Sequence, residues 1–169
     1  TKPVKVGSVT VGGGAPISVQ TMTKTDTRDV AATVAQIREV AGVGCDIVRL
    51  AVVDAAAAEA LGQICPQVNI PVIADIHFNH TLALTALAAG VAGLRINPGN
   101  IGGETKVKEV VAAAREREVP IRIGVNSGSV EKDILQKHGG STPQALVESA
   151  LRHVAILEKF GYDRIKISV

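Results

Sequence analysis

The chain is poor in aromatic side chains. Its 169 residues include no tryptophan, one tyrosine and two phenylalanines, and aromatic residues make up 2% of the total. The hydrophobic fraction of 46% therefore comes mainly from valine, isoleucine, leucine and alanine. A chain of this length can bury one sizeable core, and an aliphatic core is typical of helices packed on a parallel β-sheet.

Other absences exclude classes of partner. The formal net charge is only +2 and no run of basic residues occurs, which argues against a nucleic-acid binder that works by bulk charge. No apolar segment is long enough to span a bilayer, and no signal peptide is recognisable at the start. The two cysteines, Cys45 and Cys65, lie far apart in apolar surroundings without CxxC spacing. They are expected to be reduced thiols of a cytoplasmic protein, with no metal role.

Strand-like apolar segments alternate with helical patterns along the chain. The strand-like segments are residues 17–22, 46–52, 70–77, 93–98, 121–126 and 164–169. The helical patterns are residues 33–44, 54–64, 80–90, 104–118 and 141–161, with a short extra helix expected within 130–140. Asp54 and Thr142 are suited to cap helices at their amino ends. Residues 4–17 resemble a small hairpin with a glycine turn, of the kind that plugs the bottom of a barrel.

Repeated βα units imply parallel strands with right-handed crossovers, and both a doubly wound sheet and a barrel satisfy that. The phase of the strands distinguishes the two, because successive strand residues face opposite ways. At residues 121–126, for example, Ile121 and Ile123 oppose Arg122. A doubly wound sheet carries helices on both faces and would be apolar on both. The predicted fold is therefore α/β, a TIM-type (β/α)8 barrel whose inner face is polar near the strand ends.

The number of strands is too small for a closed barrel. A (β/α)8 barrel has eight strands and about 250 residues, whereas residues 1–169 supply about six βα units. Proteins rarely leave a buried parallel edge strand uncovered. Residues 1–169 are therefore expected to be an incomplete barrel, part of a longer protein. The alternative is that another chain contributes the missing strands.

Four cationic side chains share the polar phase of these strands. In a barrel the carboxyl ends of the strands point into one bowl, which would hold Arg49, Arg95, Arg122 and Lys166. These cations would repel one another unless an anion lies among them, and guanidinium groups bind phosphate oxygens in a bidentate manner. The alternative is a set of core ion pairs, but the single nearby carboxylate, Asp75, cannot neutralise four cations. A phosphate or diphosphate is the expected ligand.

Amide side chains and glycine loops follow two of these strands. Asn97 shares the phase of Arg95, Asn126 shares that of Arg122, and both are expected to bind the same ligand. The loops 97–103 and 126–129 are rich in glycine, and backbone N–H groups before a helix bind anions. Glycine also serves ordinary turns, so each loop alone is weak support.

Asp75 and His77 lie two residues apart and share a strand face. An acid and an imidazole beside an anion suggest proton transfer, so both are candidate catalytic residues. Metal binding is a competing role, although two ligands are too few for a site, and His77 could simply be hydrogen-bonded within the bowl. The other histidines, His80, His138 and His153, are expected to be structural or solvated.

Several motifs together resemble one enzyme family over nearly the whole chain, 4-hydroxy-3-methylbut-2-enyl diphosphate synthase of the non-mevalonate isoprenoid pathway. The motifs are VQTMTKTDTRDV, GCDIVRLAV, VIADIHF, LRINPGNIG, IRIGVNSGSVEKD, TPQALVESALRH and KISV. The resemblance implies an oxidoreductase that opens 2-C-methyl-erythritol 2,4-cyclodiphosphate and removes a hydroxyl. It also implies a 4Fe-4S cluster that receives electrons from flavodoxin or ferredoxin. In the family a second domain carries that cluster on three cysteines and a glutamate, and caps the partner's barrel in a homodimer.

The resemblance places family functions on residues already identified. It implies diphosphate binding for the four cationic residues, with Asn126 and His77 nearby, and proton delivery for Asp75. The cluster motifs are absent from residues 1–169, which are therefore expected to bind no cluster and to be inactive alone. The location implied is the bacterial cytoplasm, or the plastid of a plant or alga. Two alternatives are a pterin-binding transferase resembling dihydropteroate synthase, whose motifs are not found, and a non-catalytic anion-binding module.

Overall fold

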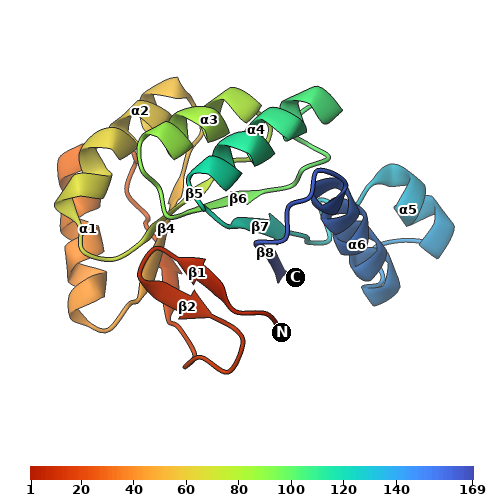
Figure 1. Ribbon diagram of the computed structural model, residues 1–169, viewed down its shortest axis with the longest axis horizontal. Helices are drawn as coiled ribbons and strands as arrows, with labels where there is room; N and C mark the ends of the chain where they lie inside the picture. The colour runs from red at the N-terminus through yellow and green to blue at the C-terminus, as the bar shows by residue number, and fades with distance from the viewer.

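Six parallel strands form an open, curled sheet in the computed structural model, which describes residues 1–169 (Figure 1). Each strand pairs with the next along the chain, in the order β3-β4-β5-β6-β7-β8. Their bounds are β3 (Gln20–Met22), β4 (Ile47–Ala51), β5 (Val72–Asp75), β6 (Gly93–Ile96), β7 (Ile121–Gly124) and β8 (Ile165–Ser168). This order, with a helix after each strand from β3 to β7, is that of an incomplete TIM barrel, so the predicted fold is confirmed.

Helices α1 to α4 and α6 lie along the outer face of the sheet, where α1 to α4 follow one another in an arc, and the short α5 packs against α6 (Figure 1). They are α1 (Val30–Gly42), α2 (Ala55–Ile64), α3 (His80–Ala88), α4 (Glu104–Glu116), α5 (Lys132–His138) and α6 (Pro143–Lys159), with a 3-10 turn η1 (Cys65–Gln67). Buried side chains such as Leu50, Leu94 and Ile121 fill the space between sheet and helices. None of the helices is long and apolar enough to cross a membrane.

Helix caps that the sequence predicts are present. The Asp54 side chain accepts a hydrogen bond from the Ala57 N–H at the start of α2, and Thr142 accepts one from Ala145 at the start of α6. Pro143 occupies the first turn of α6, where its missing N–H costs nothing. The short helix expected within 130–140 is α5.

An antiparallel hairpin of β1 (Val4–Val6) and β2 (Val9–Val11) packs beneath the sheet. Val6 joins Ile47 and Ile73 in a second buried cluster at the amino ends of the strands, on the inner face. Gly7 in the hairpin turn has a φ of 55° and lies against the Pro71 side chain. The hairpin therefore covers the bottom of the partial barrel, as predicted.

All six strands are shorter than the sequence indicates, and the difference is largest for the first and the third. The first was expected to span 17–22, but β3 begins at Gln20, Ile17 is 98% exposed, and the Val19 N–H donates to the Asp46 side chain at 2.7 Å instead of to a neighbouring strand. The third was expected to reach residue 77, but β5 ends at Asp75. His77 therefore lies in the loop beyond the strand, at the mouth of the partial barrel.

Candidate functional site

Strand register brings the predicted cations side by side on the inner face. Arg95 lies opposite Arg122, and Arg122 lies opposite Lys166 on the next strand. On the other side Asp75 lies opposite Arg95, and β4, which carries Arg49, pairs with β5. The residues between them in sequence, such as Leu94 and Ile123, are buried under the helices. We call the group Arg49, Asp75, Arg95, Arg122 and Lys166 the cationic cup.

Asp75 is the carboxylate of the cationic cup, and its side chain is only 5% exposed. Its Oδ1 accepts a hydrogen bond from Arg95 Nη1 at 3.2 Å, and its Oδ2 lies 3.4 Å from Arg49 Nε. The predicted alternative, ion pairing with Asp75, thus holds for these two arginines. Arg122 and Lys166 lie beyond the reach of Asp75, so the positive charge of the cup is only partly neutralised.

Burial and mutual repulsion disfavour the positive charges of the cup. Burial lowers the pKa of Arg122, and the charges of Arg49 and Arg95 lower it further, against an opposing effect of Asp75. Burial also lowers the pKa of Lys166, and the charge of Arg122 adds to that effect. The Nε atoms of Arg49 and Arg95 are buried without a hydrogen-bond acceptor. An anion within the cup would supply acceptors and relieve the repulsion.

A hollow of about 260 Å³ opens at the mouth beside Arg95. Its lining residues are His77, Phe78, Arg95, Asn97, Asn100, Asn126, Gly128 and Ser129. The Asn97 Oδ1 accepts a hydrogen bond from the Gly124 N–H at 3.1 Å, and the Asn126 Oδ1 accepts one from the Gly128 N–H at 3.0 Å. Since both amide oxygens are engaged, each asparagine keeps its NH₂ group for a ligand. Such donors suit an anion.

His77 lines this hollow, and the buried Asp75 lies behind it and behind Arg95. The His77 Nδ1 is 3.4 Å from Arg95 Nη1, and its Nε2 is 3.8 Å from the Asp75 Oδ1. The His77 side chain is 53% exposed, whereas Asp75 is buried. The pair therefore joins a buried acid to an imidazole that solvent reaches. No group of three His, Cys, Asp or Glu side chains in the structure could hold a metal ion.

The two cysteines do not fit an iron-sulfur cluster. Cys45 is buried and its S–H donates to the Ile47 carbonyl at 3.1 Å. Cys65 lies at the carboxyl end of α2, and burial raises the pKa of its thiol to about 11. Cluster iron is bound by thiolates, usually four of them. Residues 1–169 therefore lack the donor set for a cluster.

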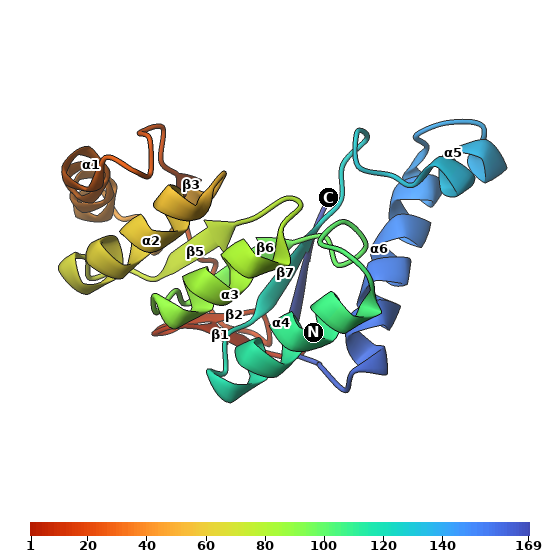
Figure 2. The same cartoon turned by 90° about the horizontal axis from the view of Figure 1, so that it is seen from above.

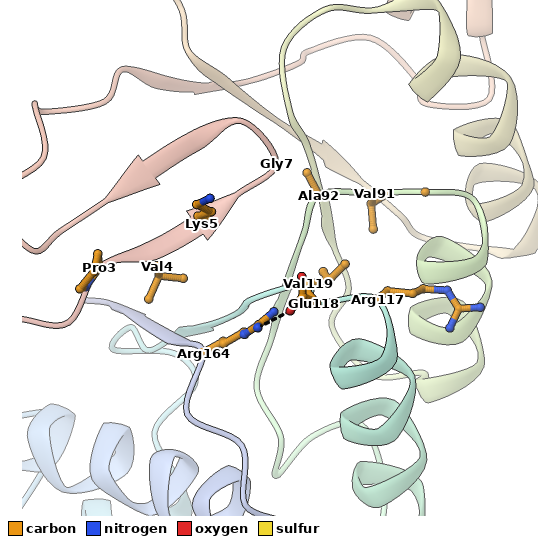
Figure 3. A pocket seen from close by; sticks show the side chains of 11 residues that line it. Pro3, Val4, Lys5, Gly7, Val91, Ala92, Arg117, Glu118, Val119 and Arg164 are labelled. Atoms are coloured by element: carbon orange, nitrogen blue, oxygen red, sulfur yellow. Dashed lines mark hydrogen bonds and ion pairs between the residues drawn. The ribbon is translucent and has the colours of Figure 1, made fainter.

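A larger hollow, of about 640 Å³, lies at the opposite end of the sheet, beside the hairpin (Figure 3). Lys5, Arg117 and Arg164 line it. Arg164 is paired with Glu118 at 2.6 Å, and Arg117 with Glu116 at 3.1 Å. Because each arginine there has a carboxylate partner, this hollow has much less unneutralised charge than the cationic cup.

The structure thus brings all the predicted site residues to one end of the sheet and adds two that the sequence analysis missed. Phe78 and Asn100 line the hollow, and Phe78 is 76% exposed. The one feature of the sequence that could have pointed to Phe78 and Asn100 is their position just beyond the end of a strand. His153, expected to be structural or solvated, is buried and contacts the loop that follows β6.

Comparison with protein families gives a match over the whole chain. A family described as GcpE TIM-barrel domain matches residues 1–169. A protein of Geobacter sulfurreducens named 4-hydroxy-3-methylbut-2-en-1-yl diphosphate synthase (flavodoxin) is 64% identical over 169 residues, which are 100% of this chain and 48% of that protein. A Pseudomonas aeruginosa protein of the same name is 59% identical over 100% of this chain and 46% of its own length. The chain thus spans about half the length of the curated relatives it matches.

Similar solved structures include dihydropteroate synthases. That of Xanthomonas albilineans superposes with a TM-score of 0.63 at 17% identity, covering 98% of this chain and 64% of that one. That of Vibrio fischeri gives a TM-score of 0.64 at 10% identity, covering 99% and 66%. At such low identities the similarity shows a shared barrel fold and carries no argument for a pterin substrate.

Proposed function

The chain belongs to the GcpE TIM-barrel domain family, and on that premise we propose that it binds the substrate of a 4-hydroxy-3-methylbut-2-enyl diphosphate synthase. The substrate is 2-C-methyl-erythritol 2,4-cyclodiphosphate. The observation that carries the proposal is the cationic cup, in which four cations lie on four strands and one carboxylate pairs with only two of them. A cyclic diphosphate brings two negative phosphates and would neutralise most of the positive charge that Asp75 leaves.

The proposed roles follow from donor geometry. The guanidinium groups of Arg49, Arg95 and Arg122 each offer several N–H donors to phosphate oxygens. Lys166 adds a point charge on the neighbouring strand. Asn97 and Asn126, with their amide oxygens already engaged, would donate their NH₂ groups at the mouth.

The reaction consumes two electrons and releases a hydroxyl as water, so it needs protons. A 4Fe-4S cluster, bound elsewhere in the full-length protein, would supply the electrons. We infer that Asp75 and His77 handle the proton, because the His77 Nε2 lies 3.8 Å from the Asp75 Oδ1 of the cup and the His77 side chain is exposed to solvent. The Asp75 carboxylate would take a proton from the His77 imidazolium and pass it to the leaving hydroxyl, and the imidazole would regain its proton from solvent.

The rest of the machinery is proposed to lie outside residues 1–169. The sheet edge at β8 is open, and Ile167 on it is 51% exposed. Val147 and Leu151 on α6 are exposed as well. Further βα units would cover these side chains, and a second domain, in a homodimer, would bring the cluster. The electron donor would be flavodoxin, which appears in the names of the relatives, or ferredoxin. The reaction would take place in the bacterial cytoplasm or in a plastid.

Residues 1–169 alone are expected to form no product from the cyclodiphosphate, even with a chemical reductant, because their donor set does not fit a cluster. The full-length protein with reduced flavodoxin is expected to turn over. The assay follows product formation by the two proteins side by side. Product from residues 1–169 would show that the chemistry needs no cluster. Binding without turnover by the full-length protein would instead favour the anion-binding module.

The affinity of the full-length protein for the cyclodiphosphate is expected to fall at alkaline pH. Burial and Arg122 lower the pKa of Lys166, so this ammonium loses its charge below the usual range for lysine. Loss of one charge-assisted contact should weaken binding by roughly tenfold or more. Each ring phosphate carries a single, strongly acidic OH, so the charge of the ligand stays constant.

Calorimetric titration between neutral pH and pH 10, with a Lys166→Arg variant as control, measures this effect. Arginine stays charged throughout the range, so the affinity of the variant is expected to vary much less with pH. An equal decline in both proteins would show that another group is responsible.

A further inference from the structure

His153 is a buried histidine on α6 that takes no part in the proposed catalysis or ligand binding. Its side chain is 1% exposed. The Nδ1 accepts a hydrogen bond from the Gly99 N–H at 3.2 Å, across 54 positions of sequence. Gly99 belongs to the loop after β6, which lies against α6 (Figure 2). Asn97 and Asn100 of the same loop line the hollow at the mouth.

The contact between ring and loop is close enough to require glycine. A Cβ on Gly99 would lie 2.8 Å from the His153 Cε1, nearer than side-chain carbons pack. The imidazole therefore rests directly on the loop backbone. Within the loop the Asn100 N–H donates to the Asn97 carbonyl at 2.8 Å, so the turn is compact. Moving the ring would move the amide groups that face the hollow.

The other ring nitrogen faces the second loop of the mouth. The His153 Nε2 lies 3.4 Å from the Glu131 Oε1, just before α5. Because the Gly99 N–H donates to Nδ1, the neutral ring must carry its proton on Nε2, toward this carboxylate. His153 thus connects the loop after β6 with the segment that follows β7.

We propose that His153 is a positioning residue, which holds Asn97 and Asn100 in place for the diphosphate through its contacts with Gly99 and Glu131. The proposal rests on the proposed function, because it assigns these amides to the cyclodiphosphate site. His153 itself lies behind the loop and touches no part of the hollow.

Protonation of the ring would break this arrangement. The charged groups around His153 are Glu131, on the segment before α5, and Arg152 beside it on α6, which pairs with Asp133 of α5 at 2.7 Å. The loop 97–100 adds no charge. Burial lowers the pKa of His153. The negative charge of Glu131 opposes this effect, and the positive charge of Arg152 lowers the pKa further. The ring is therefore neutral at pH 7 and accepts the Gly99 N–H. As pH falls through the lowered pKa, Nδ1 gains a proton and that bond is lost.

Two variants of the full-length protein separate the two contacts. In His153→Asn the amide oxygen replaces Nδ1 as acceptor, whereas His153→Gln places its amide near Nε2 and leaves the Gly99 N–H without a partner. The matched control is His138→Gln, because His138 also pairs with a glutamate, Glu148 at 2.7 Å, away from the mouth. The readouts are kcat and KM for the cyclodiphosphate and the Gly99 amide resonance in ¹⁵N-labelled protein.

We expect KM to rise roughly fivefold in His153→Gln, because the Gly99 N–H loses the hydrogen bond that ties the loop to α6, with a smaller change in kcat. His153→Asn should keep KM near that of the parent, and the control should change nothing. In the parent protein the Gly99 resonance should shift as the pH falls and His153 protonates. This measurement does not depend on the folding of any variant. Unchanged KM in both His153 variants, or a Gly99 resonance insensitive to pH, would overturn the proposal. Failure of the parent protein to bind the cyclodiphosphate would instead overturn the proposed function.

Discussion

Replacing Arg95 by alanine in the full-length protein is expected to weaken cyclodiphosphate binding by about 1.5–3 kcal/mol, roughly 10- to 150-fold in Kd. Arg95 lies at the centre of the cationic cup, hydrogen-bonded to Asp75 and opposite Arg122, with its side chain 12% exposed. Its Nε is buried and has no acceptor, so a phosphate oxygen would gain a donor that is already oriented. Calorimetry measures the loss.

The control for this substitution is Arg164→Ala, which removes an arginine from the larger hollow at the other end of the sheet (Figure 3). Its affinity for the cyclodiphosphate should match that of the parent. Unchanged affinity in Arg95→Ala, or an equal loss in both variants, would mean that the cup does not hold the ligand.

Gly124→Ala, on the neighbouring strand β7, is expected to displace the Arg95 guanidinium. A Cβ at this position would lie 2.7 Å from the Arg95 Cζ. The end of an arginine side chain can move aside, so the fold should survive while Arg95 is displaced. Binding should therefore fall about as far as in Arg95→Ala, while Gly62→Ala in α2, where a Cβ meets nothing within 4 Å, should leave it unchanged.

Asp75→Asn is expected to lower kcat by roughly 10²- to 10⁴-fold, the range for loss of a general acid, while cyclodiphosphate affinity is retained. Asparagine keeps the shape of the side chain but delivers no proton. Its effect on affinity should be small, since the substitution removes the carboxylate that competes with phosphate for Arg49 and Arg95. Steady-state kinetics and calorimetry on one preparation separate the two quantities.

A matched control is Asp163→Asn, because Asp163 is exposed and pairs only at 3.7 Å with the exposed Lys2. Neither kcat nor affinity should change in it. Parallel losses of kcat and affinity in Asp75→Asn would assign Asp75 the role of holding the two arginines in place, with no part in proton transfer.

The inner face of the sheet could be predicted because strand alternation is a local property. In each segment the phase of a few residues, such as Leu94 against Arg95, decides which side chains face the helices. The caps at Asp54 and Thr142 depend only on adjacent residues and were predicted for the same reason. Strand ends could not be predicted to the residue, since β3 begins at Gln20 and β5 stops at Asp75, both inside the expected segments.

Contacts between distant segments could not be predicted in this way. His153 resembles any other polar residue on a helix, and its bond to Gly99 exists only once α6 packs on the loop. The same holds for Gly124, which makes room for the Arg95 guanidinium from another strand. At Gly99 and at Gly124 a side chain would collide with a neighbouring residue. The sequence shows the glycine but does not show which residue lies against it.

A crystal structure of the full-length protein with the cyclodiphosphate tests the central claim most directly. The account predicts both phosphates within hydrogen-bond distance of the cationic cup, with Arg95 contacting phosphate oxygens and the Asn97 amide facing the ligand. Phosphates bound outside the cup, for instance beside Lys5 and Arg164 in the hollow near the hairpin, with Arg95 still bonded to Asp75 alone, would contradict it.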